Sequence, residues 1–405
     1  RRKIKEQNQK RKRGQMSRIL LFTGKGGTGK TTVSAATAVC AANLGYKTLA
    51  ISTDSAHSLG DSLERELGPE PVLVSKNLWA QESNILYNIE KHWGTIKKWL
   101  AALMAWRGLD EIVAEEVAVL PGMEEVANLL WVYYYEQEQN YDVVVVDCAP
   151  TAESLRLLTL PEVAGWWFKK LLPVGRKLMP IATPIVNRVT DMPLPDKEIL
   201  DSVEELFNRL EGLRVLLSDP KKTSIRLLVN PEKMVIKEAQ RTYAYLNLYG
   251  YPTDAVVCNR IIPARADGAY FEKWKKAQAG YLRDIEERFS PLPVMRVPLL
   301  DTEAVGLKRL AEVGEYLYGG SDPTQVFFEG QPINIEHNDG LYTLTMKLPF
   351  VAKGDVSLLQ SGDELIITIG NQRRSIILPQ VLLERQVKEA KFESGELKVI
   401  FEEDQ

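Results

Sequence analysis

Short apolar runs alternate with longer amphipathic or alanine-rich stretches from residue 16 to residue 318. The apolar runs predict buried strands at residues 19–22, 46–53, 141–147, 225–230, 254–259 and 293–298. The longer stretches predict helices at residues 30–45, 232–249, 268–289 and 303–318. Because strands and helices alternate, the pattern predicts an α/β fold whose parallel sheet is covered by helices on both faces.

Two further stretches predict a helical insertion in this α/β unit. Residues 83–136 have a helical pattern with a break at Pro121 and Gly122. Residues 148–215 have a helical pattern that is interrupted by prolines from Pro150 to Pro195. Prolines break helices, so the second stretch is expected to consist of short segments.

The helical insertion contains an apolar segment at residues 160–189, in which aromatic and aliphatic residues are interleaved with lysine and arginine. Together with residues 99–106, this segment could form a groove that packs around a hydrophobic helix. The alternative is that these residues belong to the core or to a dimer interface. We therefore place client-binding segments at about 83–136 and 153–215.

The pattern changes after residue 318. Residues 319–324 are rich in glycine and polar residues and predict a linker. From residue 325 to residue 405, short runs with alternating apolar positions are separated by turns. This texture predicts a C-terminal all-β sandwich after an α/β domain that spans residues 16–318.

Composition and charge exclude several classes of function. The chain has 405 residues and a net charge of −3, which implies no general affinity for nucleic acid or membranes. No run of eighteen or more apolar residues occurs, so no segment is expected to span a bilayer. The three cysteines are far apart and the three histidines are scattered, so we expect no zinc site. A soluble protein of a bacterial cytoplasm or plastid stroma fits these features.

The first fifteen residues are strongly basic and almost without apolar side chains. This composition predicts a disordered leader at residues 1–15, followed by Met16 and the first strand. The end of an organelle transit peptide and a nucleic-acid-binding arm are alternatives for this leader. We expect no nucleic-acid partner.

The sequence GKGGTGKT, from Gly24 to Thr31, fits the phosphate-binding pattern G-x-x-x-x-G-K-[ST] between a predicted strand and a predicted helix. Backbone amides of such a loop point at phosphate oxygens, and the lysine, Lys30, reaches the β- and γ-phosphates. The residues assigned to nucleotide binding here are Gly24, Gly26, Gly27, Thr28, Gly29, Lys30, Thr31 and Thr32.

Four residues are candidates for magnesium binding or hydrolysis. The hydroxyl of Thr31 and the carboxylate of Asp147, which ends the valine strand, suit Mg²⁺ directly or through water. Asp54 follows the neighbouring strand and could contribute to the Mg²⁺ network and orient or deprotonate the attacking water; a helix N-cap is its other possible role. Asp61 is a weaker candidate for the same task.

The base of the nucleotide is expected to be adenine, because the chain contains no Asn-Lys-x-Asp guanine signature. Asn259 and Pro298 end two later strands and are assigned to the nucleotide site. The amide of Asn259 could read the adenine edge, although a turn residue would have the same position in the sequence.

A second lysine, Lys25, precedes the glycine pair of the loop and is poorly placed to reach its own nucleotide. It is better placed to cross a dimer interface and neutralise phosphate charge in the facing subunit, as an arginine finger does. A solvated surface lysine is the alternative.

These motifs resemble those of a known family. GKGGTGKTT resembles the deviant Walker A loop of dimeric ATPases, STDSAHSLGDSL their switch I, and DCAPTAESLRLLTLP their switch II. The branch comprises the arsenite-pump ATPases and the guided-entry targeting ATPases for tail-anchored proteins. The resemblance implies a homodimer with Lys25 acting across the interface, Asp54 in hydrolysis, Asp147 in the Mg²⁺ network and Asn259 near adenine. It also implies that ATP closes and hydrolysis opens a groove for a hydrophobic helix or lipid-like ligand, with a membrane receptor as a possible partner.

The chain also departs from this family pattern. It has one Walker A loop, and residues 260–282 lack both the metalloid-binding cysteines and the zinc-binding C-x-x-C motif of relatives. The tail is similar to the α-crystallin domain of small heat-shock proteins. Three functions remain open: an ATPase with hydrophobic clients, a metalloid-pump ATPase, and a nucleotide-dependent switch without hydrophobic cargo.

Overall fold

The structure is a computed structural model that describes residues 17–53, 58–82, 85–108, 110, 123–148, 193–338, 341–361, 364–378, 382 and 385–403. The predicted leader, Asp54, and residues 149–192 with the predicted client-binding segment 160–189 lie outside the described residues.

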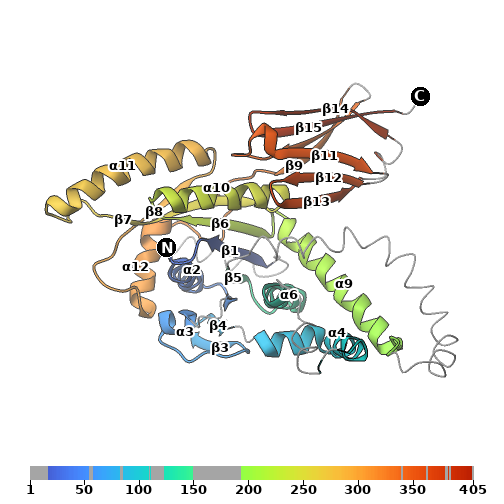
Figure 1. Ribbon diagram of the computed structural model, residues 1–405. Helices are drawn as coiled ribbons and strands as arrows, with labels where there is room; N and C mark the ends of the chain where they lie inside the picture. Colours follow the sequence, from blue (N-terminus) through green and yellow to red (C-terminus); the bar gives the residue numbers. More distant parts are fainter. Residues whose placement is uncertain are drawn as a thin grey trace.

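The α/β domain is built on a sheet with the strand order β3-β4-β2-β5-β1-β6-β7-β8 (Figure 1). Its strands are β1 (Arg18–Gly24), β2 (Thr48–Ser52), β3 (Val72–Ser75), β4 (Leu78–Glu82), β5 (Val143–Asp147), β6 (Thr223–Val229), β7 (Thr253–Ile261) and β8 (Val294–Pro298). The central strands β1, β2 and β5 are buried along almost their whole length, and their inner residues 19–22, 49–51 and 143–146 are apolar, as the apolar runs predict.

One edge of the sheet differs from the expectation of an all-parallel sheet. Strand β3 pairs antiparallel with β4, whereas the other pairings in this sheet are parallel. The sequence pattern did not predict this hairpin. In β3, Val72 and Leu73 are exposed and only Val74 is buried, so an edge strand of this kind has little apolar periodicity.

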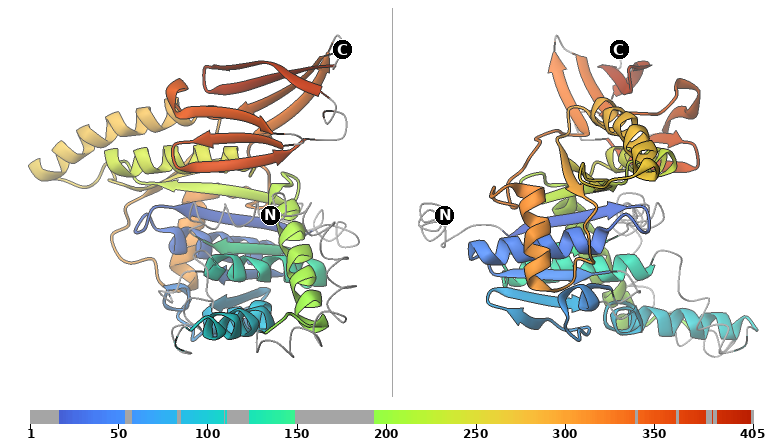
Figure 2. Two further views of the ribbon diagram at one scale, coloured as in Figure 1. Left: turned by 45° about the vertical axis from the view of Figure 1, so that its right-hand side comes forward. Right: turned by 90° about the vertical axis from the view of Figure 1, so that its left-hand side faces the viewer.

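Helices cover both faces of the sheet. On one face, α2 (Lys30–Leu44), α3 (Ser58–Leu63) and α12 (Gly306–Tyr318) share a core with the strands. The other face is covered by α6 (Met123–Glu138), α9 (Lys197–Ser218), α10 (Lys233–Leu248) and α11 (Ala269–Phe289). Helix α4 (Ile85–Trp106) packs against α6 and α9, farther from the sheet (Figure 2). The predicted helices α2, α10, α11 and α12 are thereby confirmed.

The C-terminal domain is a β sandwich of two antiparallel sheets, ordered β14-β15-β10-β9 and β11-β12-β13. Its strands are β9 (Ile333–Asn338), β10 (Leu341–Lys347), β11 (Val356–Ser361), β12 (Glu364–Ile369), β13 (Gln372–Ile377), β14 (Arg385–Glu393) and β15 (Glu396–Glu403); a short 3₁₀ helix, η1, spans Lys353–Asp355. Alternate residues of β10, β12 and β15, such as Leu344, Ile367 and Val399, fill the space between the sheets.

The sandwich rests on helix α10 of the α/β domain. The Tyr249 hydroxyl donates a hydrogen bond of 3.0 Å to Gln372 Oε1, and Arg374 donates to the carbonyl oxygen of Leu248. The ring of Phe350 packs against those of Tyr243 and Phe289, with centroids 6.2 and 5.4 Å away. Polar and aromatic contacts thus join the two domains.

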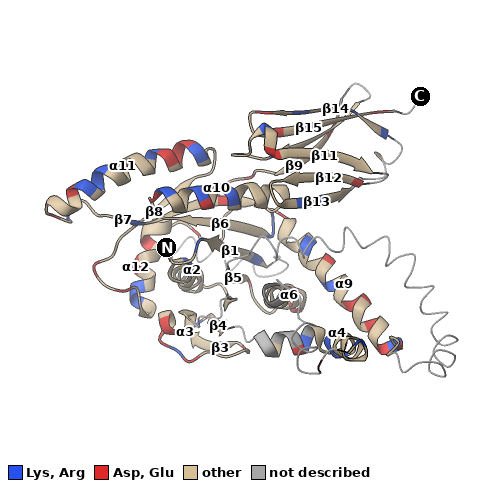
Figure 3. Ribbon diagram, viewed as in Figure 1, with Lys and Arg blue, Asp and Glu red and all other residues tan. Residues whose placement is uncertain are grey.

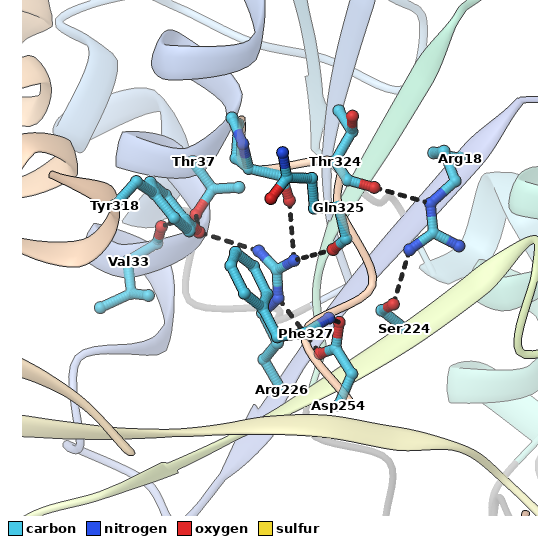
Figure 4. A network of polar contacts seen from close by, with 11 residues as sticks. Arg18, Val33, Thr37, Ser224, Arg226, Asp254, Tyr318, Thr324, Gln325 and Phe327 are labelled. Atoms are coloured by element: carbon cyan, nitrogen blue, oxygen red, sulfur yellow. Dashed lines mark hydrogen bonds and ion pairs between the residues drawn. The ribbon is translucent and has the colours of Figure 1, made fainter. Parts of the chain in front are cut away.

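The predicted linker at residues 319–324 packs against the sheet and is held by two arginines. Arg226 Nη2 donates to the carbonyl oxygen of Pro323 at 2.7 Å, and Arg18 Nε donates to that of Thr324 at 3.0 Å (Figure 4). Arg226 is fully buried, ion-pairs with Asp254 at 3.3 Å, and donates to the Tyr318 hydroxyl at 2.9 Å. Burial by itself would lower the pKa of Arg226, but Tyr318 and Asp254 raise it above its usual value, so the side chain stays a cation.

Candidate nucleotide-binding site

The loop from Gly24 to Gly29 connects the carboxyl end of β1 to the first turn of α2. Helix α2 has no side-chain cap and no acidic residue in its first turn. Its first backbone N–H groups and the positive end of its dipole are therefore available to an anion. Lys25, Gly26 and Gly27 are exposed at the tip, whereas Thr28 and Lys30 are buried. This is the arrangement of a phosphate-binding loop.

Hydrogen bonds within the loop set its shape. The hydroxyl of Thr28 donates to the carbonyl oxygen of Lys25 at 2.8 Å, and Lys30 Nζ donates to the same oxygen at 3.3 Å. Lys30 thus bends back over the loop, where its ammonium group lies beside the backbone that would hold the phosphates. The predicted position of Lys30 at the start of the helix is confirmed.

Gly29 has a left-handed backbone with φ of 90°, and a Cβ atom there would lie 2.3 Å from Asn259 Nδ2. A Gly29→Ala variant should lose about 2–3 kcal/mol of unfolding free energy, from the left-handed strain and the displaced Asn259 side chain. Urea unfolding measures this loss. Gly27→Ala is the matched control, because Gly27 also has a left-handed backbone, with φ of 78°, and no atom lies within 4 Å of its Cβ position. Equal losses for both variants would contradict the role of this close contact.

The hydroxyl and carboxylate predicted to bind magnesium lie together. Thr31 Oγ1 donates to Asp147 Oδ2 at 2.5 Å, and Ser58 Oγ of α3 lies 3.0 Å from Thr31 Oγ1. Asp147 is buried at the end of β5. Hard oxygen groups beside a phosphate loop fit Mg²⁺, which takes few protein ligands and keeps phosphate and water in its shell. Within the described residues, no group of three or more acidic, histidine or cysteine side chains could hold a metal alone.

A cavity of about 520 Å³ extends from the loop toward the ends of β7 and β8. Its lining includes the predicted residues Gly29, Thr32, Asn259 and Pro298, followed by residues 299–305. Asn259 Nδ2 donates to the carbonyl oxygen of Thr28 at 2.8 Å, and its Oδ1 accepts from the backbone N–H of Arg260. Asn259 therefore ties the end of β7 to the loop, a contact that the sequence pattern did not reveal.

Lys25 has a partner in its own chain. Lys25 Nζ lies 3.4 Å from Glu238 Oε2 of α10, and the two side chains are 41% and 46% exposed. The sequence did not indicate Glu238, which is distant along the chain. Ser58 was also missed, although it lies in the quoted segment STDSAHSLGDSL. Asp61 is exposed at the start of α3, and Asp54 lies outside the described residues.

The fold and this loop define a P-loop ATPase. Residues 17–319 match the family described as anion-transporting ATPase, and residues 339–401 match an HSP20-like domain found in ArsA. The chain therefore belongs to the anion-transporting ATPase family and is an ATP hydrolase with an α-crystallin-like C-terminal domain.

Relatives align over nearly their whole length. A protein of Aquifex aeolicus named arsenical pump-driving ATPase 1 is 42% identical over 94% of this chain and 98% of its own. One of Prosthecochloris vibrioformis, named arsenical pump-driving ATPase, is 40% identical over 95% and 96%. Protein Rv2184c of Mycobacterium tuberculosis is 31% identical over 95% and 96%. Among the described helices, none is long and apolar enough to cross a membrane.

Proposed function

We propose that this ATPase is a homodimer in which ATP binding and hydrolysis close and open a groove for helices of membrane proteins or other hydrophobic ligands. The supporting observation is the surface of α4. Its residues 99–106 are largely apolar and half-buried or exposed, and Trp106 is 40% exposed. Trp99 Nε1 donates to the carbonyl oxygen of Pro193 at 3.0 Å, a contact between α4 and a described residue of the predicted client-binding segment 153–215.

The nucleotide site supports the hydrolytic part of this proposal. Lys30 and the loop amides bind the phosphates and orient them, while the ends of β7 and β8 accept the base. Thr31 and Asp147 would hold Mg²⁺, which neutralises phosphate charge when bound. Asp54 is proposed to orient the attacking water. A membrane receptor is a proposed partner, and no nucleic acid is involved.

A photo-crosslinking residue in place of Trp106 tests the groove. With ATP and a 20-residue apolar helical peptide, it should crosslink the peptide at least about tenfold more than without nucleotide, because closure orders the hydrophobic wall. The same probe in place of Met234, which is 63% exposed on α10, is the control. Equal labelling at both positions in an active ATPase would favour a nucleotide switch without hydrophobic cargo.

Metalloid transport is the second candidate, favoured by the names of the relatives. Burial raises the pKa of Cys40 to about 11 and that of Cys258 to about 12. Near neutral pH these thiols stay protonated, whereas thiolates are the form that binds soft metals and metalloids. The chemistry of Cys40 and Cys258 therefore counts against metalloid binding at these two residues. Stimulation of ATP hydrolysis by arsenite in the same assay would support this candidate against the groove.

A further inference from the structure

Helix α11 carries an exposed aromatic stripe. Tyr270 is 69% and Trp274 is 43% exposed. Ala277, which is exposed, and Tyr281, which is half-buried and also packs against the core of the domain, continue this face at a spacing of four, three and four residues. A neighbouring face, with Gln278, Ile285 and Phe289, is buried against the rest of the domain. The end of α11 far from the sandwich projects beyond the sheet in Figures 1 and 2.

An open hollow lies beside the inner end of this stripe. It has a volume of about 320 Å³ and is lined by Ala277, Gly280, Tyr281, Arg283, Asp284 and Glu287. The small residues Ala277 and Gly280 leave room for a large side chain to approach the helix. Tryptophan and tyrosine are enriched at protein interfaces, where they fill such pockets.

Charges along α11 are arranged so that the helix complements a reversed copy of itself. Its outer half contains three lysines and one glutamate, and its inner half contains three acidic residues and two arginines (Figure 3). Lys273 and Asp284 lie on the same flank of the stripe. Neither forms an ion pair with any other residue that the structure describes.

We propose that α11 pairs antiparallel with α11 of a second copy of this chain. Trp274 and Tyr281 lie symmetrically about Ala277 and Gln278, so each Trp274 would pack on the partner's Tyr281 next to the hollow. Lys273 would form an ion pair with the partner's Asp284. Because the dimer has two-fold symmetry, this ion pair and the aromatic contact would each occur twice. This inference rests on the proposed homodimer and names its contact, in the region where this chain has no zinc-binding cysteines.

Sedimentation equilibrium without nucleotide tests the aromatic contact. The full chain should form a dimer, and Trp274→Ala should weaken its association at least about tenfold, because a buried tryptophan is lost on both sides. Tyr316→Ala on α12 is the matched control, since Tyr316 is 53% exposed outside this face. A monomeric wild-type protein, or equal association of both variants, would overturn the proposal.

Charge reversal tests the antiparallel pairing separately. Lys273→Glu and Asp284→Lys should each weaken association, and the double variant should restore it, because like charges are replaced by opposite ones. Failure of the double variant to recover would overturn this pairing. Binding of α11 to anionic lipid vesicles that Trp274→Ala abolishes, with association unchanged, would also overturn it. The mixing experiment described in the Discussion tests the ATP-dependent homodimer independently. Recovery of hydrolysis there would still support the homodimer if the α11 contact is overturned.

Discussion

Lys25→Ala should lower kcat of ATP hydrolysis by at least about 100-fold, because we propose that Lys25 reaches the facing subunit, where a cation stabilises the charge of the transition state. Its exposed ion pair with Glu238 contributes at most about 1 kcal/mol, so Lys25 can leave that partner at little cost. Steady-state hydrolysis measures the effect. The KM for ATP should change less than kcat, because Lys25 is expected to act mainly in the transition state.

Mixing two inactive variants distinguishes action across the interface from action within one chain. A Lys30→Ala subunit has lost its own phosphate lysine but can supply Lys25 to a Lys25→Ala subunit, whose loop is otherwise intact. The mixture should therefore regain hydrolysis at one of the two sites in each mixed dimer. No recovery after verified subunit exchange would show that Lys25 acts in its own chain.

Glu238→Ala is the matched control for Lys25, because it removes the same ion pair and leaves the lysine. Hydrolysis should change less than about twofold, as expected for an exposed pair. If Glu238→Ala reduces kcat as much as Lys25→Ala does, the ion pair within the chain is what matters, and the proposed role across the interface is wrong.

Arg226→Met should destabilise the protein by about 3–5 kcal/mol, the cost of leaving a buried charge without its partner. The change leaves the buried Asp254 carboxylate without its ion-pair partner. It also removes the hydrogen-bond donors to the carbonyl oxygens of Pro323 and Gln325. It also breaks the link to Tyr318, whose hydroxyl lies 2.6 Å from Thr37 Oγ1 of α2 (Figure 4). Urea unfolding should show the loss, and proteolysis at residues 319–327 should become faster.

A double variant separates the charge from the packing. Arg226→Met with Asp254→Leu should be less destabilised than the sum of the two single variants, because no buried charge remains unpaired. Arg309→Ala, which removes exposed ion pairs with Asp301 and Glu312, should cost less than about 1 kcal/mol. A similar loss for Arg226→Met and Arg309→Ala would contradict the role of the buried network.

Local sequence patterns predicted most of the fold and the loop. The apolar runs of β1, β5 and β6 were predictable because strands buried on both faces need apolar side chains at successive positions. The strands of the sandwich were predictable because apolar and polar residues alternate along them. The antiparallel hairpin of β3 and β4 was missed because an exposed edge strand needs few apolar residues. The predicted linker is a packed connection. The sequence did not indicate this, because the linker is held through its own backbone carbonyl groups, which accept from Arg226 and Arg18 and carry no sequence signature.

By itself, the sequence determined that an ATP-binding loop joins a buried strand to a helix, because glycines, a lysine and a threonine at fixed spacing act within one short segment. It also determined that an all-β domain follows. Only the tertiary structure decided that Asn259 closes on Thr28, that Glu238 holds Lys25, and that Arg226 anchors the connection between domains. Each of these contacts joins residues that are distant along the chain, and chain folding alone sets their distance and burial.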